Sequence, residues 1–322
     1  MKLFDPKTGK MNANSEGYQQ LITTLTDVNS EVSKQKFYEI PFADYVPTII
    51  GKGAFKKSIL NYKTFKTGEG FEAGLMNNGA NRQGLAQTSV AVEGQTQIIH
   101  AYAKGIEWDI FELEEAMQAN ELFSLIEAKE EARKEEWDLG LQKSAFLGIT
   151  GGSGLLNQAG ATLDNVTIPK FISAMDATEF NALTAAIYEA YRANSNRTAK
   201  PKLFIVPEKD FNGLGQYPDP TRPFKTKLQL LQELFEGLTG DKEFKILPCS
   251  YGDKANFDGV NNRYCLSSHN PRSVKFDIPL NYTATSAGTL DGFTWANAAY
   301  GQFSDVALLR EREVMYFGNT AG

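Results

Sequence analysis

Apolar and charged residues follow a helical period between Asn120 and Gly148. The apolar stripe, in which Lys129 counts by its methylene stem, consists of Leu122, Leu125, Ile126, Lys129, Ala132, Leu139 and Phe146. The opposite arc is charged and holds Glu127, Glu130, Glu131, Lys134, Glu135 and Asp138. Asn120 can cap the first amides of such a helix, and Gly148 is the residue type that commonly ends one. The pattern predicts a helix over 121–147, roughly 40 Å long, with one solvated face and a shorter helix over 109–119 before it.

Two β-like runs, 58–67 and 88–104, enclose a glycine-rich segment. The second run alternates, which places six of its residues on one face: Val90, Val92, Thr96, Ile98, His100 and Tyr102. The intervening residues 68–87 contain five glycines and few aliphatic side chains, so they cannot form a core of their own. We predict a long hairpin with a protruding, adaptable tip.

The first 54 residues are mostly polar, but they end in an apolar stretch interrupted by Pro41 and Pro47. Each proline biases the preceding residue towards extended backbone. The large apolar side chains of this stretch are Phe37, Tyr38, Ile40, Phe42, Tyr45, Val46, Ile49 and Ile50. Such an arm needs a surface to cover it, on its own domain or on a neighbouring molecule.

The second half of the chain first alternates helical and extended patterns. Helical spacing covers 178–192 and 226–238, and short apolar runs at 203–206 and 244–247 read as strands. From residue 263 onward the chain is mostly strand-like, and we expect these strands to return to the sheet under the long helix. The whole pattern predicts an α+β fold.

Composition and charge exclude several classes of protein. With 42% hydrophobic residues the 322-residue chain can build packed cores, and a net charge of −6 argues against a dedicated nucleic-acid binder. Cys249 and Cys265 give no disulfide framework and lack the paired spacing of a zinc site. No apolar run suits a signal peptide or a membrane span. We therefore expect a soluble protein made in a reducing cytoplasm.

Candidate chemistry is sparse. The glycine cluster 148–154 ends a predicted helix instead of opening one, and it lacks both GK[ST] and GxSxG, which favours a helix stop over a phosphate or acyl site. His100 and His269 have no third histidine or acidic pair near them in sequence, which disfavours a metal site or triad. The glutamates at 130, 131, 135 and 136 read as a solvated helix face. We expect no catalytic residue, no cofactor and no metal.

The remaining features describe geometry: an apolar arm, a projecting hairpin and a half-exposed helix. Such parts bury little surface in a monomer, but they can be buried against other copies in a lattice. This indicates a self-assembling subunit. The order of these parts, the run FLGITGGSGLLNQAG at 146–160 and the closing VALLREREVMYFG resemble the major capsid proteins of tailed bacteriophages with the HK97-type fold. The most specific part of this resemblance is the run GLLN, which follows a helix and a glycine turn.

This resemblance implies a division of the chain and a set of contact residues. It makes 1–54 an N-terminal arm, 55–105 an extended E-loop hairpin, 106–174 a peripheral domain with a spine helix, 175–275 a mixed α/β axial domain, and 276–322 strands returning to the peripheral domain. The implied E-loop tip contacts are Gly68, Phe71, Leu75, Met76, Arg82 and Leu85. The implied arm contacts are Phe37, Tyr38, Phe42 and Tyr45. The implied spine-helix end and turn are Gly148, Gly151, Gly152, Gly154, Leu155, Leu156 and Asn157.

The resemblance also implies a function and partners. The subunit would assemble with itself, as hexamers and pentamers, into an icosahedral shell that encloses double-stranded DNA without sequence specificity. Portal, scaffolding and decoration proteins are further candidate partners, and no membrane is expected. The expected location is the virion capsid, assembled in the host bacterial cytoplasm. An encapsulin-like nanocompartment shell is the first alternative, and a hydrolase using the 148–154 turn is the second.

Overall fold

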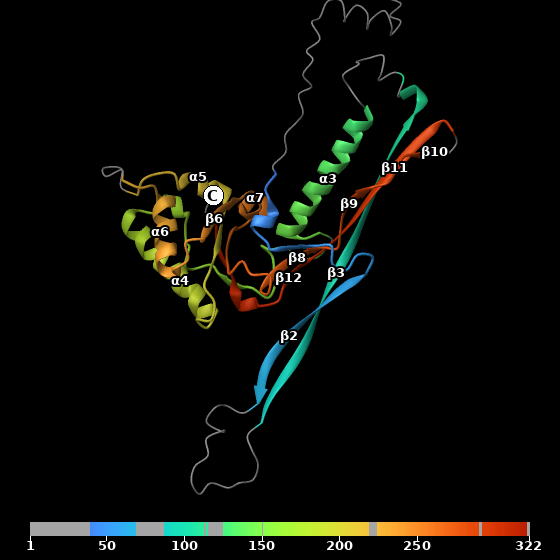
Figure 1. The fold of residues 1–322 in the computed structure, drawn as a ribbon. Coiled ribbons are helices and arrows are strands. Elements are labelled where there is room, and N and C mark those ends of the chain that lie inside the picture. Colours follow the sequence, from blue (N-terminus) through green and yellow to red (C-terminus); the bar gives the residue numbers. More distant parts are fainter. Residues whose placement is uncertain are drawn as a thin grey trace, which may run out of the picture.

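The computed structural model describes residues 39–68, 87–112, 114, 125–149, 151–218, 224–289 and 292–320. Figure 1 shows a mixed α/β unit on one side, a long helix beside it, and a long two-stranded ribbon that projects beyond both. The strands are β1 (Thr48–Ile50), β2 (Ser58–Gly68), β3 (Thr88–Asp109), β4 (Thr162–Asp164), β5 (Leu203–Pro207), β6 (Lys245–Cys249), β7 (Asn262–Ser267), β8 (Val274–Ile278), β9 (Leu280–Ala284), β10 (Gly288–Thr289), β11 (Thr294–Ser304), β12 (Val306–Leu308) and β13 (Val314–Asn319). The α-helices are α3 (Leu125–Leu147), α4 (Ala177–Asn194), α5 (Glu208–Gly213), α6 (Lys227–Thr239) and α7 (Lys254–Phe257). Short 3-10 turns are η1 (Phe42–Asp44), η3 (Ile172–Ala174), η4 (Ser250–Gly252) and η5 (Glu311–Glu313).

The mixed α/β unit is built on a five-stranded sheet in the order β4-β13-β7-β5-β6. Side chains alternate across this sheet, so that each of its two faces supplies one hydrophobic core. Phe204, Tyr264 and Phe317 pack on one face with residues of α4 and α6. Ile205 and Tyr316 pack on the other face, in the core that also contains the end of α3. The sheet therefore joins the two halves of the molecule.

Local sequence signals set the two helices of this unit. Asp176 caps α4 through the amides of Thr178 and Glu179, in a capping box. Thr226 forms a second capping box at the start of α6, which ends at Gly240 with a φ of 68°. The predicted helices over 178–192 and 226–238 are confirmed within two residues at each end.

Helix α3 packs on a second sheet, in the order β10-β11-β3-β2, with β9 paired to β11. Trp137 lies at the centre of this contact, with its ring centroid 5.1 Å from that of Tyr102 on β3 and 5.9 Å from that of Phe303 on β11. Gly301 makes room for it, because a Cβ there would lie 2.5 Å from the indole ring. The absence of a side chain on β11 therefore lets the helix approach the sheet closely.

The buried stripe of α3 differs from the predicted one. Phe146 is buried as expected, but Ala132 is exposed, and the stripe runs through Arg133, Trp137 and Leu141. Arg133 is only 2% exposed, because its guanidinium donates to Asn297 Oδ1 at 2.7 Å and to Tyr282 Oη at 2.8 Å. Hydrogen bonds to the sheet therefore make an arginine a core residue, and this turns the helix away from the predicted orientation.

The ends of the predicted helices are only partly visible. The helix expected over 121–147 is described from Leu125, and it ends at Leu147 as predicted. Of the shorter helix expected over 109–119, Asp109 is the last residue of β3 and residues 110–112 are helical. Residue 114 is helical, and the remaining residues of the two predicted helices, 113 and 115–124, lie outside the described residues.

The closing strands take two different places. Strand β11 returns to the sheet under α3, pairing with β3 from Thr294↔Asp109 to Ser304↔Ile99, as expected. The expected last run over 306–317 is two strands separated by a 3-10 turn: β12 pairs with β8, and β13 pairs with β7 and β4 in the mixed sheet. The prediction that these strands all return to the sheet under α3 is therefore wrong for β7 and β13, which lie in the mixed sheet, and for β8 and β12, which form a three-stranded sheet with β1. The apolar residues of β13 fill both hydrophobic cores.

The two cysteines are buried in the core and are not bonded to each other. Burial raises the pKa of Cys249 to about 12 and holds the pKa of Cys265 well above its ordinary value. We expect neither thiol to react with a disulfide reagent in the folded protein at neutral pH, and both to react in denaturant, because the thiolate is the reactive form. A thiol count in the two states checks this; a rapidly reacting thiol in the native protein would contradict the packing of this core.

Candidate functional site

The ribbon consists of β2 and residues 88–98 of β3, and it projects from the body of the molecule (Figure 1). Its two strands pair without interruption from Ser58↔Ile98 to Gly68↔Thr88. The predicted hairpin strands are confirmed, and β3 continues five residues beyond its predicted end at Lys104. Gly68, the first residue of the expected tip, ends β2. The other expected tip residues, Phe71, Leu75, Met76, Arg82 and Leu85, lie outside the described residues.

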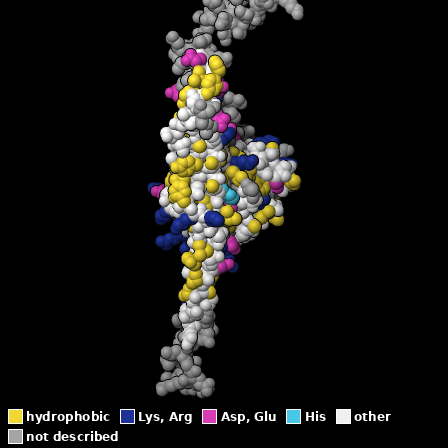
Figure 2. Space-filling view, turned by 90° about the vertical axis from the view of Figure 1, so that its right-hand side faces the viewer, with side chains coloured by type: hydrophobic (Ala, Val, Ile, Leu, Met, Phe, Trp, Pro, Cys, Tyr) yellow, Lys and Arg dark blue, Asp and Glu magenta, His cyan; other side chains and the backbone are white. Residues whose placement is uncertain are grey.

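One face of the ribbon is apolar and uncovered. The register places residues 58, 60, 62, 64 and 66 opposite even-numbered partners on β3, so these residues share a face. Its large apolar side chains are between 50% and 68% exposed: Leu60, Tyr62, Val90, Val92 and Ile98. Figure 2 shows hydrophobic side chains gathered along the ribbon below the body of the molecule. A monomeric protein rarely leaves such a continuous apolar strip to solvent, which marks this face as a contact surface.

The root of the ribbon is held by polar side chains. Gln97 is 4% exposed; its side-chain amide donates to Ser304 Oγ at 2.6 Å and to the carbonyl of Asp305, and its Oε1 accepts from Asn61 Nδ2 at 3.1 Å. Next to it, His100 Nε2 lies 3.0 Å from Asp305 Oδ1. The sequence analysis missed this cluster because the partners in each of these contacts are 36 to 208 residues apart. The cluster fixes the direction in which the ribbon leaves the body.

We expect Gln97→Leu to loosen this root. The substitution keeps the volume but removes the hydrogen bonds that Gln97 donates to Ser304 Oγ and the Asp305 carbonyl and the one that it accepts from Asn61, each of which contributes about 0.5–1.5 kcal/mol of stability. Hydrogen exchange measured by mass spectrometry should be faster than in the wild type in the strands of the ribbon root, and unchanged in α4. Thr96→Val, at an exposed position of the same strand that pairs with Leu60, serves as the control. Equal exchange in all three proteins would show that the cluster does not hold the root.

The glycine turn ends α3 as the sequence predicts. Gly148 has a φ of 77° and its amide donates to Ser144 O, and Gly151 has a φ of 82°. A side chain at Gly152 would overlap the carboxylate of Asp305, and one at Gly154 would overlap the backbone of Phe146. The turn is therefore a close-packed junction, in which the chain doubles back on the helix that it has just left.

The residues after the turn lock it in place. Leu155 and Leu156 are fully buried, and their amides donate to the carbonyls of Ala145 and Phe146 at 2.8 Å and 3.0 Å. Asn157 accepts from Gly154 N and donates to Leu147 O, both at 2.6 Å. Residues 154–157, which read GLLN, thus donate hydrogen bonds to the free carbonyls at the end of α3. Because the amides of Gly148, Gly152 and Gly154 all have protein partners, the geometry gives no support to a phosphate cradle.

The expected arm contacts are corrected by the structure where it describes them. Tyr45 is 3% exposed, with its ring 5.2 Å from that of Phe146 and its hydroxyl donating to Pro248 O at 2.5 Å. Phe42 packs edge-on against Phe276 at 5.8 Å. Both side chains therefore belong to the core of their own chain, because an apolar cluster beside β8 is available to cover them. Phe37 and Tyr38 lie outside the described residues.

Catalytic and metal chemistry find no support in the described part of the chain. No group of three or more histidine, cysteine, aspartate or glutamate side chains there is placed to hold a metal ion. Burial lowers the pKa of His269, which disfavours its charged form. None of the described helices is long and apolar enough to cross a membrane. What the described residues do present is a surface for contact with other molecules.

Comparison with known proteins decides which kind of contact this is. The sequence pattern of the family described as Major capsid protein matches residues 72–318, well over half of the 322-residue chain. The chain belongs to the major capsid protein family. Major capsid proteins assemble with copies of themselves into the shell of a capsid. The predicted phage capsid family is thereby confirmed, and this family is a structural one.

Solved structures agree with this assignment at the level of the fold. The capsid of Myoviridae phage XM1 is 16% identical with a TM-score of 0.76, covering 92% of this chain and 97% of that one. Mycobacterium phage Bobi gives 12% identity and a TM-score of 0.57, covering 94% and 98%. A virus-like particle from Pyrococcus furiosus gives 13% and 0.50, covering 85% and 90%. No curated protein sequence matches the chain. The predicted mixed helix and sheet capsid fold is confirmed.

Proposed function

We propose that this capsid protein forms the icosahedral shell of a tailed bacteriophage, as hexamers and pentamers around double-stranded DNA. The observation that carries this proposal is the uncovered apolar face of the ribbon, from Leu60 to Ile98. No described part of the chain covers that face, since the ribbon projects from the body (Figure 1), and such a face suits contact with another molecule. A subunit with such a part reaches its stable state in a lattice of copies.

Within this proposal the parts of the chain take the roles that the resemblance implies. The ribbon and the tip residues 69–86 act as the E-loop, which reaches over a neighbouring subunit. Helix α3 acts as the spine of a peripheral domain, and the mixed sheet with α4 and α6 acts as the axial domain near the centre of each capsomer. Residues 148–157 act as a rigid joint between the spine and the body, because every amide contact described above is internal.

The charge of the chain is consistent with DNA as a further partner. A net charge of −6 limits adhesion to a densely packed polyanion, which suits a wall that encloses DNA without sequence specificity. Portal, scaffolding and decoration proteins are proposed as further partners during assembly, which takes place in the cytoplasm of the bacterial host. The role is structural, without catalysis.

A nanocompartment shell is the second candidate, since the virus-like particle from Pyrococcus furiosus has a similar fold. The two candidates differ in cargo and not in subunit geometry. Matching to the major capsid protein family favours the virus.

Expression of the whole chain, alone and with the other capsid genes of its source, tests the proposal. We expect negative-stain microscopy to show closed shells, and the ratio of absorbance at 260 and 280 nm to show nucleic acid when packaging proteins are present. Shells that enclose a protein cargo and never nucleic acid would favour the nanocompartment. A folded monomer at high concentration in all salts, with no assembly beside its partners, would contradict both.

A further inference from the structure

A hollow of about 350 Å³ lies beside the root of the ribbon, where residues 51–57, the lysine loop, join β1 to β2. The apolar part of its lining comes from Ile49, Ile59 and Leu60. The polar part of its lining consists of Lys52, Lys56, Ser58, Lys275 and Asp277. The hollow therefore combines apolar side chains with three lysines and a single carboxylate.

The lysine loop carries three positive charges that nothing in the described chain balances. Lys52, Lys56 and Lys57 are all exposed, and within the described residues their ammonium groups make no ion pair or hydrogen bond. Lys275 differs from them, because it lies 2.9 Å from Asp277. The loop contains no acidic residue, although the whole chain has a net charge of −6. It therefore suits an anionic partner.

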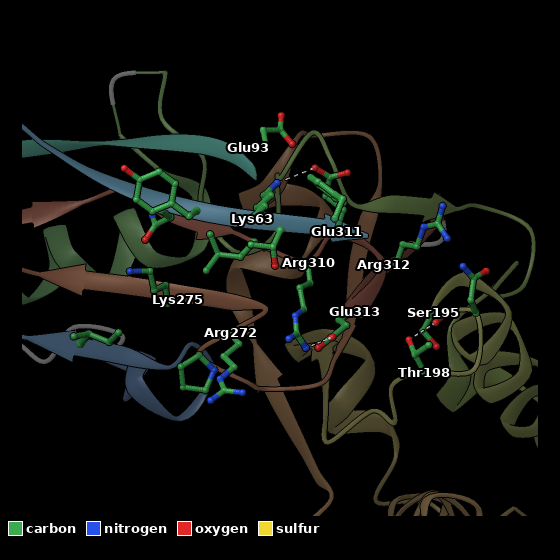
Figure 3. A pocket seen from close by; sticks show the side chains of 18 residues that line it. Lys63, Glu93, Ser195, Thr198, Arg272, Lys275, Arg310, Glu311, Arg312 and Glu313 are labelled. Carbon is green, nitrogen blue, oxygen red and sulfur yellow. Dashed lines mark hydrogen bonds and ion pairs between the residues drawn. The ribbon is translucent and has the colours of Figure 1, made fainter. Parts of the chain in front are cut away.

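A larger groove, of about 1010 Å³, adjoins this hollow and shares Lys275 with it. Figure 3 shows that acidic side chains accompany the basic ones there. Lys63 lies 3.3 Å from Glu311, and Arg310 lies 2.8 Å from Glu313. The lysine loop differs from this groove, because no acidic side chain of its own accompanies its charges.

Phe55, within the lysine loop, is held in a strained and exposed conformation. Its φ of 62° lies in the left-handed region, which a bulky residue rarely adopts. Its amide donates to Gln302 Oε1 at 2.7 Å, and the amide of Lys56 donates to Gly53 O at 3.2 Å, so the loop has a fixed shape. The ring is nevertheless 75% exposed. Backbone strain that no burial of the side chain offsets is typical of a residue that contacts another molecule.

The lysine loop lies on the side of the second sheet that α3 does not cover. Gly301 and Phe303 of β11 face Trp137 of α3, so Gln302, between them, points to the opposite side. Helix α3 carries six acidic and four basic side chains, whereas the charged residues of the loop are all basic. The two sides of this sheet therefore differ in the sign of their charge.

We propose that the hollow and the lysine loop bind an acidic segment of a decoration protein on the outside of the shell. The lysines pair with carboxylates of that segment, and Phe55 with the apolar lining holds one of its apolar side chains. The backbone of duplex DNA offers phosphates but no apolar group for Phe55, so it fits this site less well. The inference rests on the proposed function, because a wall that limits adhesion to its DNA turns the acidic side of α3 inwards and the lysine loop outwards.

Binding of a short fluorescein-labelled peptide of glutamates with a central leucine tests the site, by fluorescence anisotropy on purified subunits and on shells. Lys52→Gln with Lys56→Gln should weaken binding by about tenfold, because two charge pairs are lost. Phe55→Gly should weaken it by a similar factor without lowering the melting temperature, because glycine adopts a positive φ without strain. Lys242→Gln with Lys245→Gln removes two exposed lysines of the mixed α/β unit and should bind the peptide as the wild type does.

The outcomes separate the possible occupants of the site. Weaker peptide binding in both variants, with normal shells and normal DNA content, supports the inference. Equal binding by the wild type and the variants, no binding by the wild type, or binding that depends on the lysines but not on Phe55 overturns it and leaves the shell function standing.

Two further results assign the site to another occupant and also overturn the inference. Loss of assembly in a lysine variant that circular dichroism shows to be folded points to a second copy of the chain. Normal shells with less DNA, by the ratio of absorbance at 260 and 280 nm, point to nucleic acid. A wild-type chain that stays monomeric overturns the proposed function alone, because peptide binding is also measured on subunits.

Discussion

A chain carrying Tyr62→Glu and Val92→Lys should fold normally and form no shells. Both side chains are more than 60% exposed in the isolated subunit, so their replacement should change its stability by no more than about 0.5 kcal/mol. The two positions are diagonal neighbours across the ribbon, so the introduced charges attract each other and keep the strands paired. Loss of two buried apolar side chains should weaken every subunit contact by about 3 kcal/mol or more.

The matched control keeps the face apolar: Tyr62→Phe with Val92→Ile should assemble as the wild type does. Size-exclusion chromatography and microscopy measure assembly, and circular dichroism with thermal melting measures folding. Normal shells from the charged variant would show that this face stays in solvent in the capsid. Global unfolding of that variant would show that the ribbon is part of the core and not a projecting contact element.

Gly154→Ala should destabilise the folded subunit by about 3 kcal/mol. The new Cβ would overlap the backbone of Phe146, and the surrounding chain cannot retreat, because Leu155 and Leu156 are fully buried and bonded to the end of α3. Thermal and denaturant unfolding measure the loss.

Gly140→Ala provides the opposite case within α3 itself. No atom lies within 4 Å of the Cβ that it would add, and the residue lies in the interior of α3. We expect a gain of about 0.5–1 kcal/mol, because alanine loses less backbone entropy than glycine on folding. Equal effects of the two substitutions, in either direction, would show that the turn after α3 is less tightly packed than its geometry indicates.

Short-range signals were enough to predict much of this fold. Alternating β-branched and aromatic residues predicted both strands of the ribbon, and the helical spacing of apolar residues predicted α4 and α6. Gly148 predicted the end of α3, because glycine adopts the positive φ of a helix end without steric cost. In each case the determining interactions lie within a few residues along the chain.

Long-range interactions decided the rest. Arg133 reads as a surface residue in sequence, and it is buried because Asn297, 164 residues away, accepts its hydrogen bond. The resemblance implies that Tyr45 contacts a neighbouring subunit, but it is buried because Phe146 and Pro248 of its own chain surround it. The root cluster around Gln97 likewise depends on segments that approach each other only after folding. No local pattern contains that information.

Strand β3 has a mechanical consequence. Its 22 residues run without a break from the ribbon to the sheet beneath α3, a length of roughly 70 Å at the usual rise of a strand. The hydrogen bonds to β2 and β11 lie across this axis, so a pull on the ribbon loads many of them in shear at once instead of opening them one after another. The strand therefore acts as a stiff beam, which carries load from the ribbon directly to Trp137 and the helix above it.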